Sequence, residues 1–219
     1  MIREKIKAWF GEEKNKLVSM SPKKKWEYIW GYYKWWILGL VLAVIVVISG
    51  VRNAQYQSRE ILVSGAFINT ATSAEGYAFV NEDYWTHSGA DEGNRVELIE
   101  ARSIRYNVEQ PTSTDVNAIL AIDTQIASKT LDYIIGDISA MEFYDRQEAL
   151  LDIQTLFTKE QLSGFPTVST ENGIVAIDLE DSTLAKRFGL SAEPTYLFFL
   201  ANSPRQENCI AFLDYLFQK

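Results

Sequence analysis

Few residues in this chain have the types and spacing that catalysis requires. The single histidine, His87, is followed by Ser88. A nucleophilic serine, however, needs a base and an orienting group in a defined geometry, which adjacency in sequence does not supply. A surface histidine is the simpler interpretation. The single cysteine, Cys209, lies among apolar residues of a predicted helix, where a small core residue is expected. We therefore expect no catalytic residue and a protein that is not an enzyme.

Acidic residues gather at Asp178, Glu180 and Asp181. Carboxylate oxygens are ligands of Ca²⁺, but a calcium loop needs more ligands and a turn that glycine permits. Acidic residues near the start of a helix also complement its dipole, and we favour this interpretation. One cysteine and one histidine exclude cysteine-based zinc or iron–sulfur sites and multi-histidine sites. We expect no metal and no cofactor.

Small and polar residues follow two predicted strands, at 61–69 and 131–135. In a parallel α/β sheet, ligands bind beyond the carboxyl ends of the strands. That edge would collect five candidate ligand-binding residues: Asn69, Thr70, Gly136, Asp137 and Tyr144. Asp137 also stands where the N-cap of the next helix is expected, and capping alone accounts for it. The sequence leaves both interpretations, ligand contact and helix cap, open.

The elements that would position these residues alternate between strand and helix. Strand-like runs occupy 61–69, 95–108 with a break near 99–103, 131–135, 173–179 and 195–200. Helical patterns occupy 74–85, a segment opened by Pro111, 138–147, 182–188, and a C-terminal segment opened by a capping box at Ser203–Gln206. Such alternation predicts an α/β fold whose mainly parallel sheet carries helices on both faces.

A segment without charged residues precedes this domain. Residues 35–51 would form about 25 Å of helix, which is close to the thickness of a bilayer core. A buried core helix would not carry the aromatic belt found here, whose predicted membrane-interface residues are Trp26, Trp30, Tyr32, Tyr33, Trp35 and Trp36. A cleaved signal peptide is disfavoured by the long charged region in front of the segment. We predict an uncleaved transmembrane helix.

The charges on the two sides of this helix differ in sign. Residues 1–34 carry nine Lys/Arg and four Asp/Glu, whereas residues 52–219 carry twelve and twenty-five. The positive-inside rule therefore places the N-terminus in the cytoplasm. We predict four parts: a cytoplasmic basic and aromatic helical segment (1–34), the transmembrane helix (35–51), a polar linker (52–60) and an extracytoplasmic α/β domain (61–219). The acidic balance argues against binding of nucleic acid.

The cytoplasmic segment has two predicted helices. Ile2, Ile6, Trp9 and Phe10 share one helical face, which could lie on the anionic inner leaflet or bind a partner's helix; an unstructured charged tail is the alternative. Ser21 and Pro22 begin a second helix that runs into the membrane.

The exported part resembles a known family. The run Gln125–Asp137, the segments around Phe143 and Asp152, and the C-terminal pattern Asn202-Ser203 with Phe212-Leu213 resemble the second half of extracellular solute-binding proteins. The whole architecture is similar to uncharacterised membrane-anchored proteins of Gram-positive bacteria. Because the exported part is shorter than a two-lobed binding protein, the resemblance implies a reduced periplasmic-binding-protein-like domain, with one lobe small or the cleft lost.

These observations lead to one function hypothesis and one alternative. We expect a single-pass membrane protein whose extracytoplasmic domain is an interaction or accessory subunit of a membrane complex, with the lipid bilayer and a membrane protein, by analogy a transporter, as partners. The alternative is a tethered receptor for a small molecule. A cleft lined by converging polar groups would favour the receptor. A flat apolar patch of several hundred Å² would favour the subunit.

Overall fold

The computed structural model describes residues 18, 20–100, 107 and 112–218, and within these the side chains of Ile29, Tyr32 and Gln57 are not described. The predicted helix around Ile2 and the second half of the strand-like run 95–108 therefore lie outside the described residues. The chain divides into two compact units, residues 1–58 and 59–219.

The described part of the first unit is dominated by one long helix, α2 (Pro22–Gln57), which begins at the predicted Pro22. Within α2 the stretch Tyr33–Tyr56 has 24 residues, of which the most apolar 18 in sequence have a mean hydropathy of 2.2 and are not buried. It is long and apolar enough to cross a membrane. The predicted polar linker 52–60 is helical over its first six residues, because α2 continues to Gln57. Residues 52–57 are polar but contain no glycine or proline, so nothing in them ends a helix.

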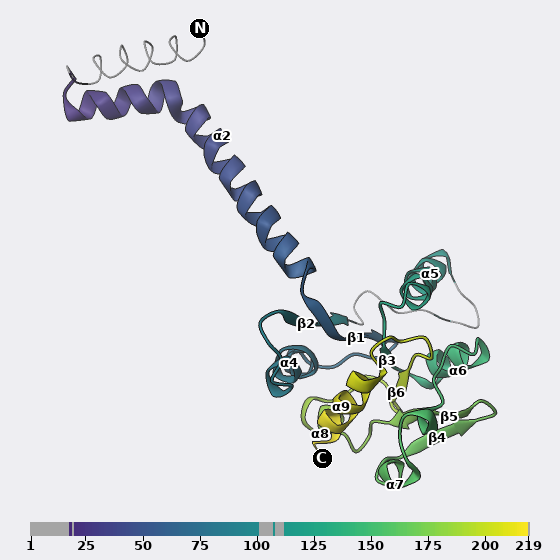
Figure 1. Ribbon diagram of the computed structural model, residues 1–219. Helices are drawn as coiled ribbons and strands as arrows, with labels where there is room; N and C mark the ends of the chain where they lie inside the picture. The colour runs from purple at the N-terminus through teal and green to yellow at the C-terminus, as the bar shows by residue number, and fades with distance from the viewer. Residues whose placement is uncertain (1–17, 19, 101–106, 108–111, 219) are drawn as a thin grey trace. The chain divides into compact units, whose positions relative to one another are not determined.

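The second unit is an α/β domain built on one six-stranded sheet (Figure 1). Its strands are β1 (Glu60–Ile68), β2 (Asn94–Ile99), β3 (Tyr133–Gly136), β4 (Thr167–Thr170), β5 (Gly173–Asp178) and β6 (Tyr196–Phe199). Its longer helices are α5 (Ser113–Ala127), α6 (Ile138–Arg146), α8 (Thr183–Phe188) and α9 (Gln206–Phe217). The short ones are α3 (Ala74–Ala78), η1 (Phe79–Asp83), α4 (Tyr84–His87), η3 (Ile153–Thr155) and α7 (Lys159–Leu162).

The sheet is mixed, so the prediction of a mainly parallel sheet is wrong. The strand order is β2-β1-β3-β6-β5-β4. Among the described strands the pairs β1–β2 and β1–β3 are parallel, whereas β6 is antiparallel to both of its neighbours and β4 is antiparallel to β5. The reversal occurs where α8 and the loop 189–195 join β5 to β6 at one edge of the sheet. There Asp178, at the end of β5, pairs with Tyr196, at the start of β6.

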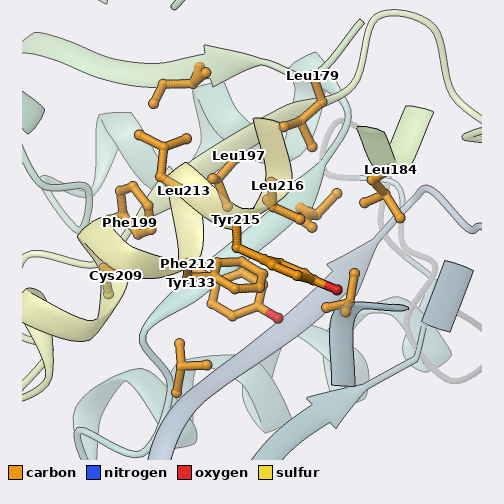
Figure 2. Packing of buried hydrophobic residues seen from close by; sticks show 14 of the residues in the cluster. Tyr133, Leu179, Leu184, Leu197, Phe199, Cys209, Phe212, Leu213, Tyr215 and Leu216 are labelled. Carbon is orange, nitrogen blue, oxygen red and sulfur yellow. The ribbon is translucent and has the colours of Figure 1, made fainter. Parts of the chain in front are cut away.

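Helices cover both faces of this sheet, as predicted, and each face has its own core. Side chains of α3, η1, α4, α8 and α9 pack on one face with those of η3 and α7, and side chains of α5 and α6 pack on the other. Figure 2 shows Phe212, Leu213 and Leu216 of α9 directed toward Tyr133, Leu197 and Phe199 of the sheet. Because both faces are covered, the central strands are apolar at nearly every position.

One glycine makes the close packing beneath α9 possible. The ring of Tyr133 lies over Gly65 of β1 and stacks on Phe212 with a centroid distance of 4.4 Å. A Cβ atom at position 65 would lie 1.9 Å from Cζ of Tyr133, so no other residue type fits there without moving the ring.

A buried carboxylate joins three parts of the domain. Asp132, which is fully buried, accepts hydrogen bonds at Oδ2 from the backbone N–H of Ser64 (2.7 Å) and from Nε of Arg205 (2.7 Å), and at Oδ1 from Oγ of Ser203 (2.6 Å). Arg205 also donates from Nη2 to the carbonyl oxygen of Thr130 (3.1 Å). This network, the Asp132 cluster, fixes β1 and the start of α9 to the residue that precedes β3.

The Asp132 cluster also explains why one predicted helix start is wrong. The sequence predicts a capping box in which Ser203 caps the C-terminal helix, but α9 begins at Gln206 and its N-cap, Arg205, makes no side-chain capping bond. The hydroxyl of Ser203 instead donates to Asp132 and accepts from the backbone N–H of Arg205. A tertiary partner thus replaces the local one.

We predict very different stability effects for two ion pairs of equal length. Asp132–Arg205 and Asp181–Lys186 both have an N–O distance of 2.7 Å, but the first carboxylate is buried and the second is exposed. Asp132→Ala should lower the free energy of unfolding by about 3–5 kcal/mol, because it leaves a largely buried guanidinium and a buried N–H without their acceptor. Asp181→Ala should cost about 0–1 kcal/mol. Urea unfolding followed by tryptophan fluorescence measures both, and equal costs would refute the structural role of Asp132.

Candidate functional site

A pocket of about 500 Å³ opens at the edge of the sheet where β5 ends and β6 begins. Its volume lies within the range of small-molecule sites. Four charged residues line it, Asp178, Glu180, Lys186 and Glu193, and its apolar wall includes Leu190 and Pro194. The loop 189–195, between α8 and β6, thus forms one side of the pocket.

The loop is fixed by hydrogen bonds to the segment that follows β1. The backbone N–H of Ala71 donates to Oγ of Ser191 (2.7 Å), and the N–H of Ser191 donates to the carbonyl oxygen of Ala71 (2.8 Å). Thr72 donates from Oγ1 to the carbonyl oxygen of Gly189 (2.7 Å). These bonds to the first part of the loop hold this wall of the pocket in place before any ligand binds.

Two buried threonines, Thr70 and Thr195, position the second part of the loop 189–195. Oγ1 of Thr70 lies 3.4 Å from Oγ1 of Thr195, and the backbone N–H of Ala192 donates to Oγ1 of Thr70 (3.3 Å). Thr70 is fully buried and Thr195 is nearly so. Thr70, predicted as a ligand contact, therefore lies behind the loop and positions it, whereas Thr195 is part of the pocket lining.

The charged lining of the pocket is predominantly negative. Three of its described residues are carboxylates, and Nζ of the lysine among them, Lys186, already lies 2.7 Å from Oδ1 of Asp181. Asp178 accepts one hydrogen bond at Oδ1 from the backbone N–H of Glu180 (2.9 Å). Burial and, to a smaller extent, the Asp178 carboxylate raise the pKa of the neighbouring Tyr196. The pocket thus suits a cationic group better than an anion.

The structure brings four of the five predicted ligand residues to this same edge of the sheet. Asn69 and Thr70 follow β1, and Gly136 and Asp137 end β3 and follow it, next to the start of β6. Asp137 caps α6, because Oδ1 accepts from the backbone N–H of Ala140 (2.9 Å), and it also accepts from Nδ2 of Asn69 (3.2 Å). None of Asn69, Gly136 and Asp137 is part of the pocket lining.

The remaining predicted residues lie elsewhere. Tyr144 of α6 is fully buried in the core with Phe143 and Met141, so it does not reach the sheet edge. The predicted membrane-interface residues all lie on α2. Trp26, Trp30, Trp35 and Trp36 are exposed there, Tyr33 is half-buried, and the side chain of Tyr32 is not described.

His87, Ser88 and Cys209, the residues considered for chemistry from the sequence, make the following contacts in the described part of the chain. His87 is exposed on α4 with its ring 4.9 Å from that of Tyr215, and the adjacent Ser88 donates from Oγ to the carbonyl oxygen of Trp85 (2.7 Å). Burial, followed by the Asp132 carboxylate, raises the pKa of the Cys209 thiol to about 12. Within the described residues, no three His, Cys, Asp or Glu side chains are grouped to hold a metal ion.

Sequence reasoning missed most of the pocket lining. Leu190, Glu193 and Pro194 lie in a stretch that has neither helical nor strand periodicity, and such stretches carry little signal. One available signal was the length of 182–188. Gly189 stops this helix after six residues, and a connection of one short helix and a loop is compatible with a next strand that starts at the same sheet edge.

Comparison of the chain with family models, with curated proteins and with solved structures finds no match.

We predict that Asp137 acts as a helix cap. Asp137→Asn keeps an oxygen that can accept from Ala140 and should change the free energy of unfolding little, because Asn caps about as well as Asp. Asp137→Ala should cost about 0.5–2 kcal/mol. Urea titration of the two variants measures the difference. If Asn is as costly as Ala, the negative charge of Asp137 matters in its own right and capping is not its main role.

Proposed function

We propose that this protein is a membrane-tethered receptor: α2 anchors it in a bilayer, and the extracytoplasmic α/β domain binds a small cationic ligand in the pocket at the sheet edge. The pocket carries this proposal, because it is the cleft with converging polar groups by which a receptor differs from an interaction subunit. The resemblance to solute-binding proteins agrees with it but remains a prediction.

The exposed surface of α2 supports the membrane anchor. The large apolar side chains of the stretch Tyr33–Tyr56 are exposed on the surface of the helix. The core helix of a soluble protein would bury such side chains. Burial of such a surface in lipid is strongly favourable, and a helix satisfies its own backbone hydrogen bonds there. The basic residues before the stretch favour a cytoplasmic N-terminus.

The lining of the pocket supports a ligand with a positive charge and a small apolar part. A primary amine can donate up to three hydrogen bonds to carboxylates, and a charge-assisted bond is about twice as strong as a neutral one. Asp178, Glu180 and Glu193 provide the acceptors, and Leu190 with Pro194 provides apolar contact. An anionic ligand would meet these three carboxylates and the ammonium group of Lys186, which Asp181 already neutralises.

A second function, the accessory subunit, is favoured by one surface of the domain. Val116 and Leu120 are one turn apart on α5 and both exposed, and with Ile138 they are the only large apolar side chains classed as exposed in the described part of the domain. Two neighbouring side chains are far less than the several hundred Å² expected of an apolar patch for a partner. We therefore rank the receptor first.

We predict that Ser58 lies on the outer side of the membrane. Ser58→Cys, expressed in intact cells, should react with a membrane-impermeant maleimide. The buried Cys209, with its thiol pKa raised to about 12, should not react and so needs no removal. The parent protein, which has only Cys209, is the control. A Ser58→Cys variant that reacts only after lysis would reverse the proposed topology.

We predict that the pocket binds a small diamine and not its anionic counterpart. Full-length protein in detergent should bind butane-1,4-diamine and ignore succinate, a dicarboxylate with four carbon atoms, in isothermal titration calorimetry. Glu193→Gln should weaken diamine binding about tenfold, because it removes a charge-assisted hydrogen bond worth about 1.5 kcal/mol.

A matched variant separates the pocket from general charge attraction. Glu92→Gln removes the same charge from an exposed residue between α4 and β2, outside the pocket lining, and should leave diamine affinity unchanged. If the Glu193 and Glu92 variants lose the same amount of diamine affinity, the acidic domain attracts the diamine by its overall charge and not through the pocket. Binding of succinate in place of the diamine would contradict the proposed ligand class.

A further inference from the structure

The first turn of α2 concentrates positive charge where a helix tolerates it least. Lys23, Lys24 and Lys25 follow Pro22 directly, and this turn contains no acidic residue. The N-terminal end of a helix carries a partial positive charge, so cations there are unfavourable. None of the three lysines has an ion-pair partner among the described residues. An anionic partner outside the chain would relieve this repulsion.

The same part of the helix presents an exposed aromatic surface. The rings of Trp26 and Trp30 are stacked, with centroids 6.1 Å apart and planes 12° from parallel, and both side chains are exposed. At a spacing of four residues they share one helical face, and Lys23 lies near that face. Nζ of Lys34 lies 5.7 Å from the ring centroid of Trp35, which extends the pairing of basic and aromatic groups to the start of the apolar stretch.

We propose that the segment Pro22–Trp30 is a binding surface for anionic phospholipid head groups at the surface of the bilayer. This inference rests on the membrane anchor proposed above. The lysines supply charge complementary to lipid phosphates, while Trp26 and Trp30 occupy the interface between head groups and acyl chains, where indole rings partition. A lipid is favoured over free phosphate because the aromatic surface continues along the same helix into Tyr33–Tyr56.

The test uses full-length protein reconstituted in vesicles and a reporter next to the lysines. Ser21 forms no side-chain capping bond, so Ser21→Cys is a mild substitution, and the buried Cys209 does not compete for label. A bimane attached to the introduced thiol is quenched by lipids that are spin-labelled near the top of an acyl chain. We compare quenching by spin-labelled phosphatidylglycerol with quenching by spin-labelled phosphatidylcholine, both diluted into unlabelled phosphatidylcholine.

The expected result is severalfold stronger quenching by phosphatidylglycerol, falling as the salt concentration rises because Lys23 and Lys24 are exposed. Replacing Lys23, Lys24 and Lys25 by Gln should bring the two quenching efficiencies close together. Replacing Lys129, Lys159 and Arg146 by Gln removes the same charge from the α/β domain, outside the pocket lining, and should leave the preference unchanged. Co-flotation with vesicles is measured in parallel for every variant.

Several outcomes would overturn the proposal. If the Lys23/Lys24/Lys25 variant still prefers phosphatidylglycerol to phosphatidylcholine, other basic residues cause the preference and the proposal is wrong. Loss of preference in 10 mM inorganic phosphate, at the same ionic strength as a chloride control that retains it, would mean that the surface takes free phosphate. Co-flotation without any lipid preference would refute the head-group site and leave the anchor intact, whereas absence of co-flotation would refute both.

Discussion

The buried carboxylate of Asp132 is the constraint on which the arrangement of the domain depends. It lies where the chain enters β3, and its acceptors are filled by β1 through Ser64 and by the start of α9 through Ser203 and Arg205. A carboxylate is costly to bury unless its lone pairs are satisfied, so all three partners are needed. Two of them, Ser203 and Arg205, hold the start of α9 at the sheet. Phe212 of α9 stacks on Tyr133, whose ring in turn lies over Gly65.

The sequence predicted those features whose causes are local. Asp137 caps its helix, which is one of the two interpretations left open, and the helix predicted over 182–188 forms between the cap Ser182 and Gly189, because a cap acts on a backbone group within a few residues. The apolar strands were found because both faces of the sheet are covered. Two predictions were wrong because they depend on distant contacts. The helix does not start at Ser203, since that side chain bonds to Asp132, 71 residues away. The direction of a strand depends on the sheet edge that the chain reaches before it. Strand β4 was not predicted from the sequence. The dipeptide Asn172-Gly173, between two runs that contain β-branched residues, is a recognised sign of the hairpin that β4 forms with β5.

The candidate site was predictable in place but not in composition. The rule that ligands bind beyond the carboxyl ends of parallel strands selected the edge at which the pocket lies, and four of the five residues chosen by it lie there. The pocket itself lies further along that edge, where β6 reverses direction and the loop 189–195 stays at the edge. Thr70 connects the predicted residues to the pocket. It follows the parallel strand β1, and its hydroxyl contacts Thr195 and Ala192 of the loop that leads into the antiparallel strand β6. Tyr144 was misplaced because its ring packs inward among the apolar side chains of α6.

The acidic α/β domain attracts cations over its whole surface, independently of any pocket. Residues 52–219 carry twenty-five acidic and twelve basic side chains, so any cation is enriched near their surface. Enrichment of this kind acts over many ångströms and is screened beyond about 10 Å at 0.1 M salt. Contacts inside a pocket are less exposed and are screened less. Selective binding therefore has to come from short-range contacts with the acidic residues of the pocket lining, Asp178, Glu180 and Glu193, while Lys186 of the same lining pairs with Asp181. A receptor on this scaffold would gain speed of association from its overall charge and selectivity from the loop that Thr70 holds in place.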